Sequence, residues 1–226
     1  MGFYQRHVLP HLIDRGMRVG EIARYREQIV PLAYGHVLEI GAGSGLNLPF
    51  YGPQVEQVLA LDNSAELLRM TQARAAHTAF DLCILHDDAR GVPLANGTVD
   101  TVVTTFTLCS IPEATKALRE TRRVLKPGGL LLFAEHGLAP DPSVQAWQRR
   151  LSPLWSKLAG GCRLDRRIDA LIAEAGFAIT TLDTRHVRGP RPFTYVYAGQ
   201  ARPLPDGVDA DQVNAPGRLP RPSAGR

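Results

Sequence analysis

Short apolar runs alternate with amphipathic segments through the middle of the chain. The runs are rich in Val, Leu and Ile, which is typical of strands covered on both faces. We expect strands at 37–40, 58–61, 80–85, 99–103, 130–134, 177–183 and 193–198. Helical spacing predicts helices at 67–75, 114–125, 143–158 and 166–175. Strands that alternate with helices form βαβ units, so we expect an α/β fold: a seven-stranded, mostly parallel sheet with helices on both faces.

The two ends of the chain differ from this middle part. Residues 1–32 are predicted to be helical, and Pro10 is expected to kink or split them. This segment is expected to cover the core or a ligand; the alternative is a lid or a membrane-facing helix. Residues 200–226 are rich in Pro, Arg and Gly, which predicts a disordered tail. The expected division is therefore a cap at 1–32, one domain at 33–199 and a tail at 200–226.

Composition fits one globular domain with a sizeable core. Of 226 residues, 44% are hydrophobic and 21% are charged. The net charge is +4, but Lys and Arg are scattered, so no nucleic-acid partner is expected. Weak attraction to an anionic membrane surface is an equal alternative. The N-terminal region has no long apolar run, so neither a signal peptide nor a membrane span is expected.

The three cysteines, Cys83, Cys109 and Cys162, are far apart, and the sequence contains no C-x-x-C motif. Neither a zinc site nor a disulfide framework is therefore expected, and no metal is assigned. Free thiols fit a reducing cytosol, so we expect a cytoplasmic location, with peripheral membrane contact through residues 1–32 as an alternative.

The most informative stretch is 36–51, HVLEIGAGSGLNLPFY. Gly41, Gly43 and Gly45 follow the first strand, and glycines can adopt positive φ and let a ligand approach the backbone. A helix beginning near Ser44 would direct free N–H groups at that ligand. We therefore predict a nucleotide site, although a purely structural turn is the alternative. A dinucleotide fingerprint G-x-G-x-x-G would need glycine where Leu46 stands.

Polar residues also follow the other predicted strands. Asp62 ends the second strand, where α/β nucleotide folds bind ribose hydroxyls. The alternative is that Asp62 is only a turn or helix-entry residue. Asn63 with Glu66 resembles an N-cap pair for the next helix, so Asp62 is less needed for that structural role. Ligands of such sheets lie beyond the carboxyl ends of the strands. We expect the strand ends to converge there with their residues Asp62, Asp88, Thr105 and His136.

Three further expectations concern residues near these ends. Ser110 with Glu113 predicts a capping box, so Ser110 is expected to cap a helix rather than act as a nucleophile. Cys109 is expected to be a small core residue. Trp147 and Trp155 are expected in the core or in the wall of an apolar pocket.

Four stretches together resemble the class I S-adenosylmethionine (SAM) methyltransferases. They are VLEIGAGSG at 37–45, LALD at 59–62, DAR-x-x-PL at 88–94 and LRETRRVLKPGGLLLFAEH at 118–136. The resemblance covers about 36–199 and implies a Rossmann-like fold with SAM as cofactor. The chain is similar above all to the thiol S-methyltransferase group, through TLCSI at 107–111, Glu135-His136 and WQRRLSPLW-x-x-x-x-GGCRL at 147–164. It departs from the eukaryotic members in lacking a strongly apolar N-terminal anchor, which bears on membrane residence and on the acceptor.

The resemblance also implies roles for individual residues. The glycine turn would back the methionine part of SAM, and Glu39 would help to hold the ammonium group through the loop. Asp62 would hold the ribose, Asp88 and the Ala89 backbone the adenine, and Thr105 would face the sulfonium. The residues expected to bind SAM are Glu39, Gly41, Ala42, Gly43, Gly45, Asp62, Asn63, Asp88, Ala89 and Thr105.

These features predict methyl transfer from SAM to a small, apolar acceptor, with a thiol as the first candidate. Direct transfer needs no covalent enzyme intermediate. His136 is hypothesised to position or deprotonate the acceptor; the alternative is a histidine bonded to a loop carbonyl. The alternative functions are methylation of a phospholipid amine or a quinone-type ring, SAM binding by a regulatory protein without turnover, and an NAD oxidoreductase.

Overall fold

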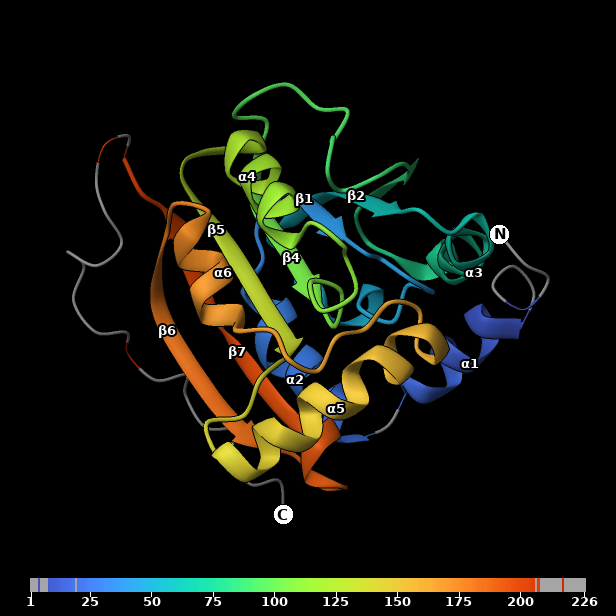
Figure 1. The fold of residues 1–226 in the computed structure, drawn as a ribbon. Coiled ribbons are helices and arrows are strands. Elements are labelled where there is room, and N and C mark those ends of the chain that lie inside the picture. The colour runs from blue at the N-terminus through green and yellow to red at the C-terminus, as the bar shows by residue number, and fades with distance from the viewer. Residues whose placement is uncertain (1–3, 5–7, 19, 206, 208–216, 218–226) are drawn as a thin grey trace, which may run out of the picture.

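A single seven-stranded sheet runs through the computed structural model, which describes residues 4, 8–18, 20–205, 207 and 217 (Figure 1). The strand order is β3-β2-β1-β4-β5-β7-β6. The strands are β1 (Gly35–Ile40), β2 (Val55–Asp62), β3 (Asp81–His86), β4 (Val99–Thr105), β5 (Leu125–His136), β6 (Phe177–His186) and β7 (Tyr195–Pro203). The first five strands pair in parallel, and β7 is antiparallel to both β5 and β6. The predicted Rossmann-like, mostly parallel sheet is confirmed.

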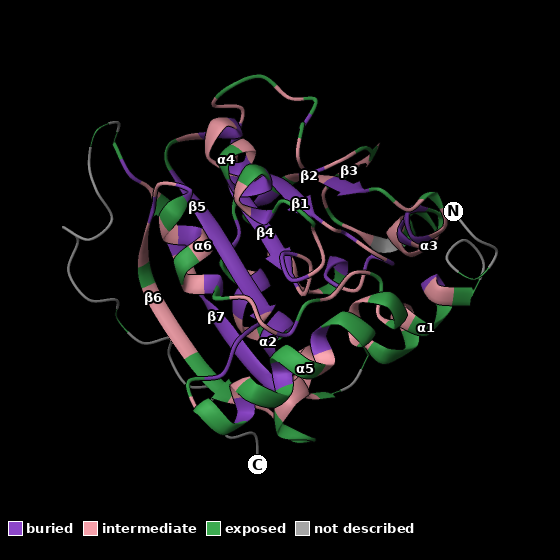
Figure 2. Cartoon of the chain, in the orientation of Figure 1, coloured by how far each residue is buried: buried purple, intermediate pink, exposed green. Residues whose placement is uncertain are grey.

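Helices cover both faces of this sheet. Successive strand residues point to opposite faces, and both faces carry apolar side chains that the helices bury. One face packs against α4 (Ala114–Val124) and α6 (Ile168–Glu174) in a core that contains Leu38, Val102, Leu118, Leu131 and Ile172. The other face packs against α2 (Gly20–Ile29) in a core that contains Tyr25, Ile29, Val37, Val103 and Leu132. Figure 2 shows the burial concentrated in the central strands. Strand order reverses between β1 and β4, and such switch points are where α/β sheets bind ligands.

The described residues of the N-terminal segment are largely helical, as predicted, whereas the kink or split expected at Pro10 stays a prediction, because residues 5–7 lie outside the described ones. Pro10 lies in the first turn of α1 (Leu9–Gly16), where its missing N–H breaks no helical hydrogen bond. The chain leaves this helix at Met17 and forms α2, followed by the 3-10 turn η2 (Val30–Leu32). The contact of residues 1–32 with a membrane surface stays a prediction.

Three local predictions around the strand ends are wrong. No α-helix begins near Ser44: a run of turns leads to the 3-10 helix η3 (Leu48–Phe50). The N-cap of α3 (Ala65–Arg74) is Ser64 rather than Asn63, and its hydroxyl accepts from the Leu67 N–H at 3.4 Å. The residues 108–110 form a turn, and α4 begins after Glu113 without a side-chain cap, so Ser110 is not its N-cap.

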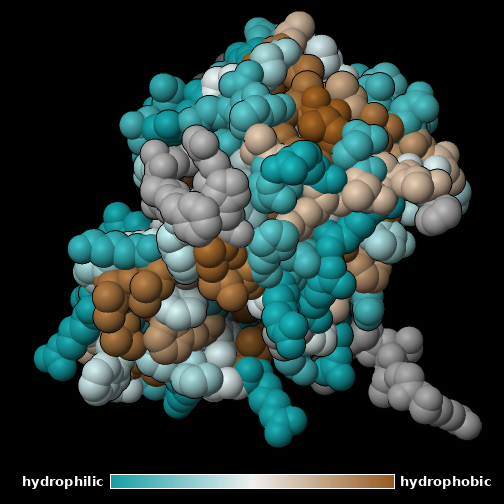
Figure 3. Space-filling model, turned by 90° about the vertical axis from the view of Figure 1, so that its right-hand side faces the viewer, coloured by the Kyte–Doolittle hydropathy of each residue, from teal (hydrophilic) through white to brown (hydrophobic). Residues whose placement is uncertain are grey.

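Several large apolar side chains of the helix predicted at 143–158 are on the surface. The helix itself, α5 (Pro142–Leu158), is present, but Trp147 is 55% exposed and Leu154 is 62% exposed. Helix α5 ends beside α1, since a Cβ on Gly160, two residues after α5, would lie 3.4 Å from Ile13 Cδ1 and 3.6 Å from Leu9 Cδ2 of α1. Apolar patches broken up by hydrophilic side chains are visible on this side of the molecule (Figure 3). Trp147 is therefore not a core residue, because none of the described elements covers its side of α5.

The C-terminal boundary lies further along the chain than expected. Strand β7 runs to Pro203 rather than ending at 198, and Leu204 is buried. Most of the predicted tail, 200–226, falls outside the described residues. Gly217 is described, and it bridges to Thr181 of β6. Among the described residues, no helix is long and apolar enough to cross a membrane.

Two leucine substitutions test the assignment of the core, one at a buried position of β5 and one at an exposed position of α5. Leu132→Ala empties a fully buried site on β5, so it is expected to cost about 2–5 kcal/mol of unfolding free energy. Leu154→Ala on exposed α5 is expected to change it by less than about 0.5 kcal/mol. Urea unfolding followed by circular dichroism measures both. Equal losses in the two variants would contradict this assignment of the core.

Candidate SAM site

The loops that follow β1 and β4 meet at the carboxyl-end edge of the sheet. The Gly41 and Ala42 N–H groups both donate to the Leu61 carbonyl, at 2.8 and 3.0 Å. The Thr107 hydroxyl donates to the Gly41 carbonyl at 3.4 Å. The glycine turn is thus joined to the ends of β2 and β4, as convergence of the strand ends predicts.

The glycine turn needs glycine for two different reasons. Gly41, Gly43 and Gly45 all have positive φ, at 68°, 58° and 78°. A Cβ on Gly41 would also lie 2.2 Å from the Thr107 side chain, so this position has no room for a methyl group. A Cβ on Gly43 would meet nothing nearer than 3.8 Å. The backbone at Gly43 is therefore open, which suits close approach of a ligand.

Asp62 holds the turn in place from the end of β2. One carboxylate oxygen accepts from the Gly43 N–H at 2.9 Å, and the other accepts from the Ser64 N–H at 2.8 Å. The side chain is 9% exposed, and burial raises its pKa, while the Ser64 and Gly43 N–H groups oppose this rise. Each carboxylate oxygen has a further lone pair, so Asp62 can still accept from a diol. The neighbouring Asn63 side chain is exposed.

Glu39 is the second buried carboxylate of the site. It accepts from Asn47 Nδ2 and from the Tyr51 hydroxyl, both at 2.8 Å. Burial raises its pKa to about 7, and the Tyr51 and Asn47 hydrogen bonds and the buried Arg26 guanidinium oppose the rise. Glu39 thus shapes the loop from beneath, in agreement with a role exerted through the loop. Asn47 and Tyr51 are site residues that the sequence analysis missed.

Thr105 and Asp88 are at the expected strand ends, but both have partners within the protein. The Thr105 hydroxyl accepts from Asn47 Nδ2 at 3.0 Å, in the same network as Glu39. The Asp88 carboxylate pairs with Arg90, with Nη2 2.7 Å from Oδ2, and this pairing lowers its pKa. Ala89 beside it is buried. The roles predicted for these residues toward the sulfonium and the adenine stay predictions.

Helix α1 also contacts the glycine turn, a contact that its sequence does not reveal. Asp14 accepts from the Ser44 hydroxyl at 2.5 Å and pairs with Arg74 of α3 at 2.8 Å. Arg74 donates in addition to the Ser44 carbonyl. The cap segment is thereby fastened to the turn, which favours a cover over the ligand.

Glu135, at the end of β5, organises the loop after β4. It is fully buried and accepts from the Thr104 hydroxyl at 2.8 Å and from the N–H groups of Thr107 and Cys109 at 3.1 and 3.4 Å. Burial raises its pKa to about 7, although these hydrogen bonds oppose the rise. An acid at the end of a continuous apolar run was the signal that could have identified it.

His136 uses one ring nitrogen for a loop carbonyl. Its Nε2 contacts the Phe193 carbonyl, so this nitrogen carries a proton and donates. The other nitrogen, Nδ1, lies 3.9 Å from Cys162 Sγ. Cys109 is buried, and Trp155 stacks against Phe193 with 4.7 Å between ring centroids. The geometry matches the loop-carbonyl alternative, and the role of His136 toward the acceptor stays a prediction.

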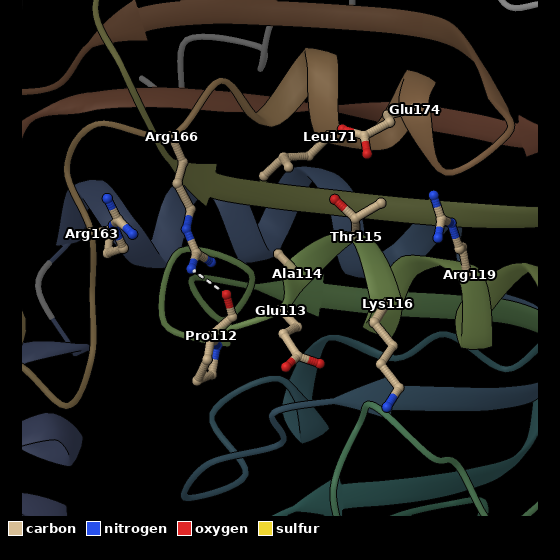
Figure 4. Close-up of a pocket in the computed structure, with 10 residues that line it drawn as sticks. All are labelled: Pro112, Glu113, Ala114, Thr115, Lys116, Arg119, Arg163, Arg166, Leu171 and Glu174. Atoms are coloured by element: carbon tan, nitrogen blue, oxygen red, sulfur yellow. Dashed lines mark hydrogen bonds between the residues drawn. The ribbon is translucent and has the colours of Figure 1, made fainter.

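A separate cavity of about 510 Å³ opens between α4, α6 and the segment at 163–166 (Figure 4). Arg166 reaches across it and donates to the Pro112 carbonyl at 3.2 Å, and also to the Leu108 carbonyl. None of the residues predicted to bind SAM lines this cavity. Arg166 therefore braces the loop after β4, to which Glu135 is also hydrogen-bonded.

Fold and site together define an α/β methyltransferase. A family model described as a methyltransferase domain matches residues 38–133. The thiol S-methyltransferase TMT1A of Homo sapiens is 34% identical over 72% of this chain and 69% of its own length. TMT1B of Rattus norvegicus is 36% identical over 72% of this chain and 66% of its own length. A phosphatidylethanolamine N-methyltransferase of Cereibacter sphaeroides is 33% identical, with 62% and 68% covered.

Solved structures show the same fold. A methyltransferase structure from Bacillus halodurans has a TM-score of 0.66 at 18% identity and covers 82% of this chain and all of its own. The [4+2]-cyclase SpnF has a TM-score of 0.64 at 17% identity, with 82% and 81% covered. The chain belongs to the class I SAM-dependent methyltransferase family, with SAM as its cofactor. It spans about two thirds of the length of the curated relatives it matches.

The residues present fit this cofactor. The open backbone at Gly43 and the spare acceptor capacity of the buried Asp62 suit an adenosyl ligand. Among the described residues, no group of three or more His, Cys, Asp or Glu side chains is placed to hold a metal ion.

Asp62 can be tested directly by ligand binding. Asp62→Ala removes an acceptor for a ribose hydroxyl and frees two N–H groups of the site. A charged hydrogen bond contributes about 1.5–3 kcal/mol, so the Kd for S-adenosylhomocysteine in calorimetry is expected to rise by about 10- to 150-fold. The control is Asp81→Ala. Asp81 begins β3, at the edge of the sheet away from the site, so the Kd is expected to stay unchanged. An unchanged Kd in a folded Asp62→Ala protein would contradict the role.

Glu135 predicts a characteristic dependence of stability on pH. In the unfolded chain its carboxyl ionises near 4.5, whereas in the folded protein the pKa is about 7. The folded state therefore binds more protons between these values, and unfolding free energy falls as pH rises through this window. Glu135→Gln cannot ionise at this position, so its unfolding free energy is expected to fall by on the order of 3 kcal/mol less between pH 4.5 and 7 than that of the unsubstituted protein. Urea unfolding at several pH values measures it; parallel curves for the two proteins would contradict the assignment.

Proposed function

We propose that this methyltransferase transfers the methyl group of SAM to the sulfur of a small, apolar thiol. The supporting observation is the meeting of three segments that carry the sequence resemblance to the thiol S-methyltransferases. Glu135 binds the backbone of 107–109, and the Arg163 N–H donates to the Cys109 carbonyl at 2.9 Å. Cys162 faces His136. These segments adjoin the glycine turn through Thr107, and that turn is the one predicted to bind the methyl donor.

The chain has a limited chemical task in this reaction. SAM, when bound, supplies an activated methyl group on a sulfonium. The protein binds both partners, aligns them and excludes water, and such positioning can contribute up to about 7–11 kcal/mol. The rings of Trp155 and Phe193, which pack against each other beside His136, offer apolar surface for an uncharged substrate. A thiol with an ordinary pKa near 8.5 is partly thiolate at neutral pH, so a strong base is not required.

Side-by-side turnover on a small alkyl thiol, a phosphatidylethanolamine and a quinol tests the acceptor. The thiol is expected to be methylated fastest, with kcat/KM rising about tenfold per pH unit and levelling near its pKa of about 8.5, because the thiolate attacks. Transfer of labelled methyl from SAM measures each rate. Faster turnover of either other acceptor would overturn the thiol assignment.

The same assay decides the role of His136. If Nδ1 accepts the thiol proton, His136→Ala lowers kcat/KM below pH 8 and spares it above the thiol pKa. An unchanged rate and pH profile would remove the base role and leave His136 as a support for the Phe193 loop.

A further inference from the structure

Cys109 and Cys162 form a thiol pair that the proposed methyl transfer does not use. Cys109 lies in the loop after β4, and Cys162 lies between α5 and α6. The N–H that follows Cys162, that of Arg163, donates to the Cys109 carbonyl at 2.9 Å, which sets the two backbones side by side. Each thiol shifts the pKa of the other, so the two side chains lie within reach of each other, and both thiols are free.

The surroundings make the two sulfurs unequal. Cys162 is half-buried, and the hydrogen bond from Cys109, together with His136, holds its pKa well below the usual range. Cys109 is 2% exposed, and the bond with Cys162 and burial raise its pKa. His136 Nδ1 lies 3.9 Å from Cys162 Sγ. This asymmetry favours the thiolate form at Cys162, the sulfur that oxidants attack first, and Cys109 is placed to resolve the oxidation product.

We propose that Cys109 and Cys162 are a reversible redox site, which a peroxide converts to a disulfide across the loop that borders the SAM site. The geometry that carries the proposal is the adjacency of the two backbones, the contact between the thiols and the imidazole beside Cys162.

The reaction balances with one peroxide. The Cys162 thiolate attacks a peroxide oxygen; the S–O bond forms, the O–O bond breaks, and hydroxide takes up a proton to leave as water. The Cys109 sulfur then attacks the sulfenic sulfur of Cys162; the S–S bond forms, the S–O bond breaks, and hydroxide leaves with the Cys109 proton as a second water. The two thiols lose two electrons, and the peroxide gains them. A reducing thiol reverses the step by exchange.

The disulfide would link two segments that flank the proposed acceptor site. Cys109 lies two residues after Thr107, which contacts Gly41, and Cys162 follows the glycines at 160–161. A Cβ on Gly161 would lie 2.9 Å from the Ser110 carbonyl, so the two segments are already closely packed. A disulfide between the two segments would restrict their separation beside the proposed acceptor site. Turnover of the oxidised protein is therefore expected to fall. This regulatory consequence rests on the proposed function, whereas the disulfide itself does not.

The experiment treats the purified full chain with hydrogen peroxide, blocks the remaining thiols and digests with trypsin. A cross-link is expected between the peptides 91–116, which holds Cys109, and 158–163, which holds Cys162. Cys83 on β3 is a matched internal reference, since it is also half-buried. Cys162 is expected to be oxidised at least tenfold faster than Cys83, and dithiothreitol is expected to restore both free thiols of the pair.

Variants separate the steps. Cys83→Ser is expected to leave the cross-link intact, and Cys162→Ser to abolish it. Cys109→Ser is expected to leave a Cys162 sulfenic acid that a 1,3-dione reagent labels. Oxidation of Cys162 no faster than that of Cys83, or no cross-link between the two peptides, overturns the redox site. Full turnover of the cross-linked chain overturns its regulatory consequence. Failure of the reduced chain to methylate any thiol bears on the proposed function alone.

Discussion

Carboxylates buried near the carboxyl ends of β1, β2 and β5 hold this site together. Burying a charged group is costly unless hydrogen bonds satisfy it. Asp62 is satisfied by the N–H groups of two loop residues and Glu135 by a hydroxyl and loop N–H groups, while Glu39 is satisfied by Asn47 and Tyr51. Each acid thereby fixes one loop at the carboxyl-end edge. The loops are irregular in themselves, and their shape is set by these acceptors beneath them rather than by local propensity.

The sheet could be predicted from sequence because its strands are continuous apolar runs, and runs such as Leu130–Ala134 leave few other interpretations. The convergence of strand ends followed from the parallel order. The helix expected near Ser44 could not form, because Gly43 and Gly45 adopt positive φ and Pro49 follows within the next turn. Local spacing also could not show that the Trp147 side chain is exposed, since exposure depends on which elements pack against α5.

The partners of the site residues were the least predictable feature. Asp62, Asp88, Thr105 and His136 all follow predicted strands, but Thr105 is bonded to Asn47, and Asp88 is paired with Arg90. Such pairings join residues whose side chains meet only after the loops have folded. The contact of Asp14 with Ser44 spans thirty positions and carries no local signature at all. Glu135 had a usable local signal, an acid directly after the apolar run Leu130–Ala134, but its partners on the loop after β4 had none.

Strand β7 lies between β5 and β6, although it is the last strand made during synthesis. Until Tyr195–Pro203 has left the ribosome, β5 has no neighbour on one side, and its apolar residues present an open edge. Open apolar edges are templates for pairing between chains. The nascent protein consequently depends on its final strand for protection against self-association, and a chain interrupted shortly before Tyr195 would be prone to aggregate however well its cofactor half had folded.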